Sequence, residues 1–494
     1  MRRFLTGKTT WRVHEEVRSA LLVDVQDYYR AFYEAASRAK RSILILGWQF
    51  DSDVQLLRGD DTVPGGDPRQ YELLTLLDRL CRERPELEVK MLAWNHSLFF
   101  SFEREVLQKV VFDISSVDRL AFETDGTVPL GGSHHQKVVI IDGQIAFMGS
   151  ADLCQDRWDT SAHVARDPQR VSRNAAPYKP YHEVQAVFAG EAVRTFVDLF
   201  VHRWHFATGV RLDPERLVAA ESADLFASLP VTLPMPVAAV GFSRTVPPGE
   251  DRSHVHEIRD LYVRAIHRAE RMIYIETQYL TSQCVRDALV SRMKDEQLPK
   301  LDVVVVLPRK PEKLKEELTI GGPQADALAE IAAAAKEWGH ALGIYDVAVT
   351  DPDHPTAPEA FVYIHAKLMI VDDVFFTMGS ANLANRSMTV DSEINASWVA
   401  QPGDHALRAA IRRVRVRLLL EHVGDVPRSV RVVAGRSGLV SRLDRVAREG
   451  KGRLRHHDLS RDLPSVIAKA VADLTCNYVD PTDGAEPLPP PSVC

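Results

Sequence analysis

The chain has 494 residues, 45% of them hydrophobic and 26% charged, which excludes a disordered protein and predicts two or three globular domains. Its formal net charge of −7 gives no general attraction to nucleic acid, so no nucleic-acid partner is expected. Five cysteines without disulfide-framework or metal-ligand spacing favour a reducing compartment.

The beginning of the chain carries charge, but no apolar run of signal-peptide length follows it. Nowhere does an uninterrupted apolar stretch of about 18 residues occur, which is the length that a membrane-spanning helix needs. The sequence therefore predicts a cytoplasmic protein, and any association with a membrane would be peripheral.

Helices and apolar strands alternate along the first half of the chain. Apolar and aromatic residues at helical spacing in 21–39 predict a helix, and the apolar run 42–48 predicts a buried strand. The remaining predicted elements of this half are a helix at 72–81, a strand at 87–93, a hairpin at 138–148, a strand at 184–188 and a helix at 191–204.

The second half repeats this pattern about 230 residues later. Its predicted elements are a helix at 262–269, strands at 272–275 and 301–307, a helix at 325–338, a hairpin near 368–379, a strand at 394–399 and a helix at 405–420. So long a period suits two similar domains rather than a solenoid. We expect two α/β sandwich domains, with mixed β-sheets flanked by helices, from an internal duplication.

The segment 230–248 is rich in proline and small residues and is the most linker-like part of the chain. We therefore expect an N-terminal domain at 1–240, a second domain at 241–425 and a C-terminal extension at 426–494.

The motif around which both halves are organised occurs once in each. Ser133–Gly143 and Ile364–Asp373 carry His, Lys and Asp at the same offsets, and Met-Gly-Ser-Ala follows both. Because side chains alternate along a strand, each His shares a face with the Lys two residues later. The Asp of each copy falls in a hairpin turn, so turn formation is favoured over chemistry for Asp142 and Asp372.

A paired imidazole and ammonium suit a phosphoryl group. The ammonium neutralises oxyanion charge, and the imidazole can serve as a nucleophile or a general acid. Two such half-sites facing each other could cleave a phosphodiester, with one His attacking phosphorus and the other protonating the leaving oxygen. The active site is therefore expected at the interface of the two halves.

The repeated His-x-Lys-x4-Asp-x6-Gly-Ser pattern resembles the phospholipase D superfamily. The second copy continues with the residues Asn382, Arg386-Ser387 and Asp391-Ser392-Glu393. Further stretches resemble the lipid-cleaving branch: Asp152-Leu153 with Arg157-Trp158-Asp159, Tyr181-His182-Glu183-Val184, and Tyr274 to Tyr279.

The resemblance implies roles for the motif residues. His135 would form a phosphohistidine intermediate, and His365 would be the general acid that later activates water or an alcohol. Family spacing gives Glu393 to His135 and Glu183 to His365 as orienting acceptors, although both carboxylates could instead be structural.

Oxygen-binding groups complete the expected site. Lys137, Lys367 and Asn382 are assigned to the phosphate oxygens, with Ser150 and Ser380 in support. Asp152 stands where the commoner family pattern has Asn, and we interpret it as a structural acceptor. No cofactor and no metal are expected, because each half-site pairs its His with a Lys, which is a poor metal ligand when charged. His134 points away from His135 and is expected to have a core or surface role.

These features predict a phospholipase D that hydrolyses glycerophospholipids at a membrane surface, with water or an alcohol as acceptor. Alternatives are a cardiolipin-synthase-like phosphatidyltransferase, a nuclease of the same superfamily, or a non-catalytic phosphate-binding scaffold. Both half-sites lie in one chain, so a monomer suffices.

Two basic stretches each allow two interpretations. The segment 160–181 is either a solvated loop or a contributor to headgroup capture. The segment 408–455 could favour an anionic membrane surface, although a solvated helix face explains its charges as well.

Overall fold

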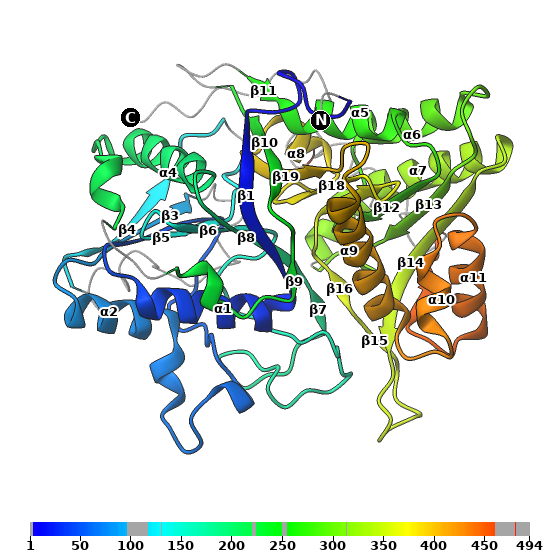
Figure 1. The fold of residues 1–494 in the computed structure, drawn as a ribbon. Helices are drawn as coiled ribbons and strands as arrows, with labels where there is room; N and C mark the ends of the chain where they lie inside the picture. Colours follow the sequence, from blue (N-terminus) through cyan, green and yellow to red (C-terminus); the bar gives the residue numbers. More distant parts are fainter. Residues whose placement is uncertain are drawn as a thin grey trace.

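The structure is a computed structural model that describes residues 3–95, 117–129, 131–219, 224–248, 254–312, 314–459 and 480. Two mixed β-sheets lie side by side, with helices on their outer faces and between them (Figure 1). This architecture confirms the predicted α/β class. The C-terminal extension is described only as far as residue 459 and at Asp480.

The sheet of the first half has seven longer strands, and the two-residue strand β9 (Leu233–Pro234) also pairs with β1. Their order is β1 (Arg12–Val23), β8 (Val184–Ala189), β6 (Ile145–Gly149), β5 (Val138–Ile141), β2 (Ser42–Gly47), β3 (Glu88–Trp94) and β4 (Leu120–Asp125). Strands β2, β3 and β4 are parallel, and the others are antiparallel. The sheet is therefore mixed, as the hairpin motif required.

Helices cover both faces of this sheet, so the residues of β2 form a continuous apolar run. Ile43 and Ile45 pack with α1 (Asp24–Arg38) and α2 (Leu73–Glu83) on one side. Leu44 and Leu46 pack with α4 (Val193–Thr208) on the other side. Burial on both faces explains why strand periodicity is absent from this segment.

The sheet of the second half repeats the order strand for strand. It runs β10 (Ala238–Val246), β19 (Glu393–Val399), β18 (Phe375–Gly379), β17 (Leu368–Val371), β12 (Met272–Glu276), β13 (Asp302–Val306) and β14 (Ala341–Val349). The outer face packs with α5 (Glu257–His267), α6 (Gln283–Lys294) and α7 (Leu314–Glu337). The matching topology supports the internal duplication.

The remaining elements are short or C-terminal. They are the helices α8 (Asn385–Thr389), α9 (His405–Val423), α10 (Ser429–Ala434) and α11 (Leu439–Glu449), the 3-10 helices η1 (Gly59–Asp61), η2 (Pro68–Tyr71), η4 (Pro214–Leu217) and η5 (Phe226–Ser228), and the strands β7 (Tyr181–His182), β9 (Leu233–Pro234), β11 (Val255–His256), β15 (Ala360–Phe361), β16 (Tyr363–Ile364) and β20 (Leu454–His456).

The expectation of a linker at 230–248 was wrong. Most of this segment is β9 and the nine-residue strand β10, and β10 pairs with both β1 and β19. The residues Val240 and Phe242 are buried, and a Cβ at Gly241 would lie 2.7 Å from Leu5. Small residues here allow close packing, not flexibility. Because β1 pairs with β10 along its first half and β8 along its second, the two sheets are joined.

A shared core also joins the halves. One apolar cluster contains the facing sides of both sheets together with α4, α9 and α11. Within it, the ring of Phe188 on β8 stacks on Trp398 of β19 with centroids 5.8 Å apart. The two halves therefore bury apolar surface against each other, which fixes their relative placement. The domain bounds 1–240, 241–425 and 426–494 stay a proposal.

Several arginines of the C-terminal basic stretch bind within the fold. Arg415 is buried against Asp373, with nitrogen–oxygen distances of 2.7 and 3.0 Å. Arg442 donates to three backbone carbonyls, and Arg417 pairs with Glu421. Much of this charge therefore has a structural partner.

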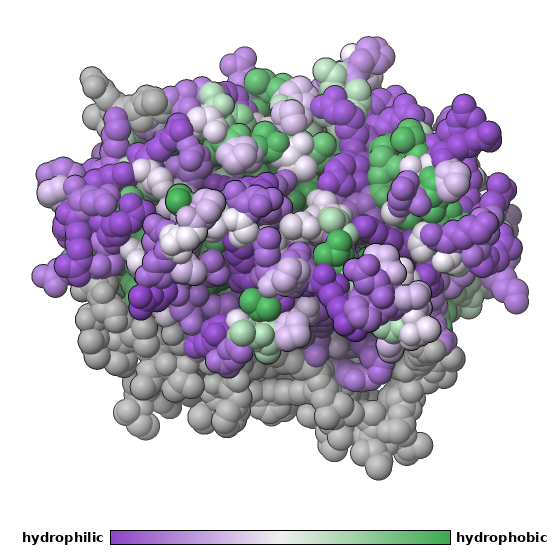
Figure 2. All heavy atoms as spheres, turned by 90° about the horizontal axis from the view of Figure 1, so that it is seen from below, coloured by the Kyte–Doolittle hydropathy of each residue, from purple (hydrophilic) through white to green (hydrophobic). Residues whose placement is uncertain are grey.

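The surface of the described residues is largely hydrophilic on the face that Figure 2 shows, with hydrophobic residues in small separate groups. Within the described ranges, no helix combines the length and the apolar character needed to cross a membrane.

Candidate active site

The two halves meet at their motifs through matching strand contacts. His135 N donates to Ser392 O at 3.0 Å, and Ser392 N donates to Ser133 O at 2.9 Å. The equivalent contact occurs at the second motif: β7 runs parallel to β16, and His365 N donates to His182 O at 2.9 Å. The backbone before each motif His therefore lies beside the backbone before the motif Glu of the opposite half.

Each motif His is held by a Glu from the other half. His135 Nδ1 lies 3.0 and 3.1 Å from the two carboxylate oxygens of Glu393. His365 Nδ1 lies 2.7 Å from Glu183 Oε1. A proton on each Nδ1 donates to the carboxylate, which leaves Nε2 as the reactive nitrogen. Both predicted His–Glu pairs are thus in contact.

Two serines orient these carboxylates. Ser150 donates to Glu183, and Ser380 donates to Glu393. Each Ser follows the hairpin of the same half as the Glu it contacts. Both hydroxyls are fully buried, and each contacts a motif carboxylate.

The motif lysines lie beside the histidines. Lys137 Nζ donates to His135 O at 3.2 Å and pairs with Asp152 Oδ2 at 3.2 Å. Lys367 Nζ donates to His365 O at 2.6 Å and to Gln278 Oε1 at 3.2 Å. Asp152 also accepts a hydrogen bond from Trp48 N at 2.9 Å. Its carboxylate therefore holds both Lys137 and the backbone that follows β2.

Asn382 offers an unused polar atom. Its side-chain oxygen is buried and accepts no hydrogen bond from the described residues. A buried amide without a partner is costly, and such groups are concentrated at functional sites. The orphaned atom is consistent with the oxygen-binding role expected of Asn382, since flipping the amide presents its N–H groups instead.

Burial and neighbouring cations disfavour the charged form of the His365 imidazole. Burial and the cations Lys367, Arg157 and Lys137 hold the pKa of His365 well below its usual value. Burial raises the pKa of its partner Glu183. Positive charges from both halves therefore act on the His365 imidazole, so the two half-sites lie close enough for their charged groups to interact.

Sequence reasoning did not assign roles to Arg157, Tyr181 and Tyr363, although two of them stand in the stretches that carried the resemblance. The Arg157 guanidinium lies 4.7 Å from the ring centre of Tyr181. Tyr181 in turn lies 5.6 Å from the His365 ring, and Tyr363 lies 6.3 Å from it. These aromatic side chains form one wall around His365.

Comparison with known proteins identifies the family. The Phospholipase D family model matches residues 35–233, and the model described as Cardiolipin synthase, PLD-like domain matches residues 262–415. The chain belongs to the phospholipase D superfamily. The two matches each cover one His–Lys motif, which agrees with the internal duplication.

Similar proteins include members of this superfamily from distant organisms. Phospholipase D A of Dictyostelium discoideum is 26% identical over 82% of this chain and 36% of its own length. Phospholipase D alpha 1 of Zea mays is 26% identical over 87% of this chain and 68% of its own length. The chain thus spans about a third of the first relative and about two thirds of the second.

The fold has a counterpart among solved structures. The phosphatidylserine synthase of Haemophilus influenzae Rd KW20 aligns with a TM-score of 0.52 at 12% identity, covering 88% of this chain and 95% of that chain. At that identity the likeness concerns the phospholipase D fold alone.

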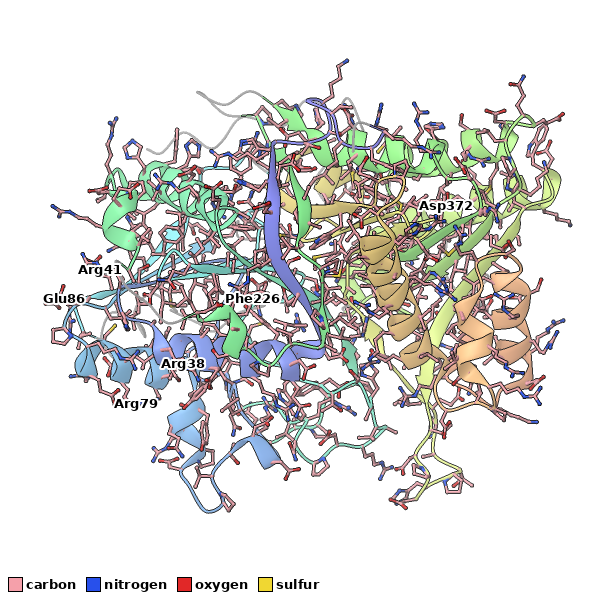
Figure 3. The ribbon with its side chains drawn as sticks, in the orientation of Figure 1. Arg38, Arg41, Arg79, Glu86, Phe226 and Asp372 are labelled. Carbon is pink, nitrogen blue, oxygen red and sulfur yellow. The ribbon has the colours of Figure 1, made fainter. Side chains whose placement is uncertain are left out.

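The motif aspartates lie in the turns, away from the reacting nitrogens. Asp142 accepts from the backbone N–H groups of Lys40, Arg41 and Ser42 at 2.7 to 3.0 Å. Asp372 accepts in the same way from residues 270–272 at 2.7 to 2.8 Å. Figure 3 labels Asp372 in the second half of the molecule. Both aspartates have φ near +55°, as the hairpin turn requires.

We expect Asp142→Ala to lower the free energy of unfolding by about 3 kcal/mol, because three backbone N–H groups lose their acceptor. Asp142→Asn keeps one acceptor oxygen and should lose less. Urea unfolding measures both effects. An alanine variant of unchanged stability that loses activity would contradict the structural role.

The pKa of Lys367 leads us to expect that anion binding depends on pH. Burial, with a smaller contribution from Lys137, lowers the Lys367 pKa to about 7, although Glu183 opposes the shift. The side chain is charged below this pH and neutral above it, so affinity for an anion should fall as pH rises through 7. We expect the inhibition constant of glycerophosphocholine, whose diester charge is constant here, to rise about tenfold per pH unit above 7.

Lys367→Met is the matched control for this titration, because it keeps the length of the side chain without the amine. In competition assays from pH 5 to 9, Lys367→Met should bind glycerophosphocholine weakly, and its affinity should lack the pH dependence that Lys367 causes in the wild type. An alkaline limb that persists in Lys367→Met would assign it to another residue.

Proposed function

We propose that the chain hydrolyses glycerophospholipids to phosphatidic acid and free headgroup through a covalent phosphohistidine on His135. The observation that carries this proposal is the exchange of carboxylates between the halves. His135 is oriented by Glu393, and His365 is oriented by Glu183. A site for one phosphate alone would not need two separately oriented imidazoles.

In the first step, His135 Nε2 forms a bond to phosphorus. The phosphorus–oxygen bond to the headgroup breaks, and its electron pair remains on the headgroup oxygen, which takes a proton from His365 Nε2. Glu393 stabilises the positive charge that develops on His135. Lys137 and Lys367 neutralise the phosphate oxygens, and an N–H of Asn382 donates to one of them.

His365 must carry a proton for this step, yet burial and the surrounding cations favour its neutral form. A bound phosphodiester adds a negative charge beside Lys137 and Lys367 and so raises the His365 pKa. Protonation of the acid is thereby coupled to arrival of the substrate.

In the second step, water attacks phosphorus, and neutral His365 takes its proton. The bond between phosphorus and His135 breaks, which releases phosphatidic acid and restores both imidazoles. An alcohol in place of water gives a phosphatidyl alcohol. We propose that the protein meets its lipid as a monomer at a membrane surface in the cytoplasm.

Mass spectrometry of the products from mixed phospholipid vesicles with ethanol present tests this function. We expect phosphatidic acid and phosphatidylethanol, because ethanol intercepts the phosphatidyl enzyme. Cleavage of oligonucleotides without any lipid product would overturn the assignment.

A phosphatidyltransferase is the second candidate, since the family model that matches residues 262–415 is described as cardiolipin synthase. Adding phosphatidylglycerol to the same assay separates the two activities. Cardiolipin formed in large excess over phosphatidic acid would favour the transferase, and the reverse ratio would favour hydrolysis.

A further inference from the structure

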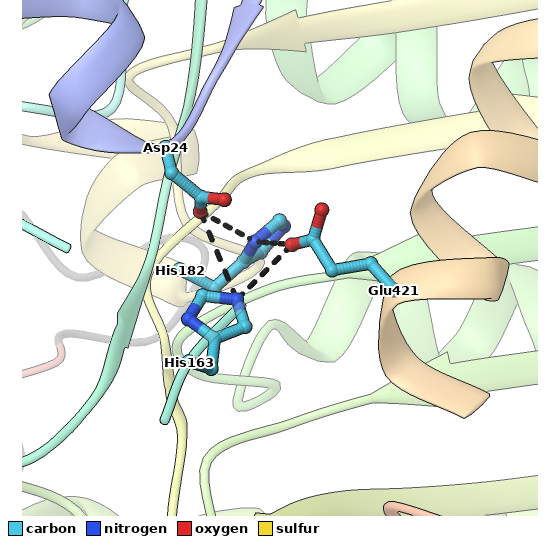
Figure 4. A group of neighbouring side chains, drawn as sticks. All are labelled: Asp24, His163, His182 and Glu421. Atoms are coloured by element: carbon cyan, nitrogen blue, oxygen red, sulfur yellow. Dashed lines mark hydrogen bonds and ion pairs between the residues drawn. The ribbon is translucent and has the colours of Figure 1, made fainter. Parts of the chain in front are cut away.

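A second group of titratable side chains lies buried outside the two His–Lys half-sites. It consists of Asp24 at the start of α1, His163, His182 on β7 and Glu421 on α9. All four are buried, and their side chains point at one another from four separate segments (Figure 4). None of them has a part in the chemistry proposed above.

Four ligand-type atoms of this group converge. His182 Nδ1 lies 2.8 Å from Glu421 Oε1 and 3.0 Å from Asp24 Oδ1. His163 Nε2 lies 3.1 Å from the same Glu421 oxygen and 3.9 Å from the same Asp24 oxygen. These distances bracket the edge of about 3.3 Å that a tetrahedron has when its metal–ligand bonds are about 2.0 Å.

The outward nitrogens have the partners that metal-binding histidines usually have. His163 Nδ1 lies 2.9 Å from Asp159 Oδ2, and His182 Nε2 lies 3.0 Å from Glu276 Oε2. A carboxylate on the far nitrogen fixes the ring and the tautomer, so that the near nitrogen presents its lone pair. Both histidines are therefore oriented for coordination toward the shared centre.

Hydrogen bonds alone do not satisfy all the close contacts of this group. His182 Nδ1 can carry only one proton, yet it faces two carboxylate oxygens at 2.8 and 3.0 Å. The carboxylate oxygens that Asp24 and Glu421 contribute to this group also lie within 4.8 Å of each other, and two negative charges so close in a buried site repel. A cation at the centre would relieve that repulsion.

The backbone is held in an unusual conformation at two of the four residues. Asp24 has φ of 66°, and His163 has φ of 44°, in the left-handed region that residues with side chains rarely adopt. Such strain persists only where the surrounding structure requires it, and it is concentrated at functional sites.

We propose that Asp24, His163, His182 and Glu421 bind one divalent cation of the zinc type in a closed tetrahedral site. Two imidazoles and two carboxylates are ligands that zinc accepts, and four protein ligands leave no open position for catalysis. Without a metal, two doubly protonated imidazoles balance the charge of the two carboxylates. The divalent cation replaces the inward-facing proton of each imidazole, so the net charge of the cluster is unchanged.

The position of the site indicates a structural role. His182 directly precedes Glu183, which orients His365. The cation would tie β7 to α1 of the first half and to α9 of the second half. It would therefore stabilise the segment that carries Glu183, without touching the phosphate.

The test is the metal content of the full chain, purified without a histidine tag and passed through gel filtration after incubation with zinc. Mass spectrometry should find about one zinc per chain in the wild type and less than about 0.1 in His163→Gln and Asp24→Asn. The matched control is His457→Gln, which removes another buried His bonded to a carboxylate, Asp346, and should keep its zinc.

Two further measurements keep the proposal testable if the variants fail to fold. Removing zinc from the wild type with a chelator should lower its Tm by at least about 5 °C, and zinc should restore it. X-ray absorption at the zinc edge should find nitrogen and oxygen ligands, two of them imidazoles, and no sulfur.

Three results would overturn the proposal. They are a wild type without stoichiometric zinc, zinc that remains in both folded ligand variants, and sulfur ligands in the absorption spectrum. The first would make the cluster a hydrogen-bonded network of charged histidines and carboxylates.

Discussion

Replacing His135 with alanine should reduce the turnover of a phospholipid at least about 10⁴-fold, because the nucleophile itself is removed. The variant should fold, since the backbone N–H of residue 135 still donates to Ser392. Glu393 loses one partner but keeps the hydroxyl of Ser380. Initial rates on phosphatidylcholine vesicles, with circular dichroism as a check on folding, measure the effect.

A buried histidine outside the site provides the control for this experiment. Within the part of the chain that the structure describes, the His340 side chain bonds to the backbone of the second half, at Leu301 and Met293. His340→Gln should keep activity within a few fold at temperatures where it is folded. Wild-type activity in His135→Ala would refute the role of this residue.

Replacing His365 with alanine should produce a different defect. Loss of the general acid should lower the turnover of phosphatidylcholine by about 10²- to 10⁴-fold. A substrate such as phosphatidyl-p-nitrophenol needs no proton on its leaving group, so its first step should be largely restored. The second step still lacks its base, and the phosphoenzyme should accumulate.

Rapid mixing of His365→Ala with phosphatidyl-p-nitrophenol measures the formation and accumulation of the phosphoenzyme. We expect a burst of about one nitrophenolate per active site and then slow turnover. His135→Ala should give no burst with the same substrate. A burst in His135→Ala and none in His365→Ala would exchange the roles of the two histidines.

Local pattern was enough to predict the elements that carry the motifs. The β-branched runs bounded by Asp-Gly or Asp-Asp are the hairpins β5–β6 and β17–β18, since these residues favour a strand and a tight turn regardless of distant contacts. The repeat in the sequence also predicted the repeat in strand order.

Features that depend on distant contacts could not be predicted from local pattern. The strand Ala238–Val246 reads as a linker because its small residues make sense only once Leu5 and β19 pack against it. The grouping of Asp24, His163, His182 and Glu421 brings together four parts of the chain, and no spacing in the sequence reveals it. Gln278 likewise acquires a role only through its contact with Lys367.

The position of the covalent phosphoryl group tests the central claim most directly. Wild-type protein can be mixed with phosphatidyl-p-nitrophenol, quenched in alkali within milliseconds, digested, and mapped by mass spectrometry under conditions that preserve phosphohistidine. We predict a phosphatidyl or phosphoryl group on the peptide that contains His135. Modification of the His365 peptide, or rapid turnover with neither peptide modified, would contradict the mechanism.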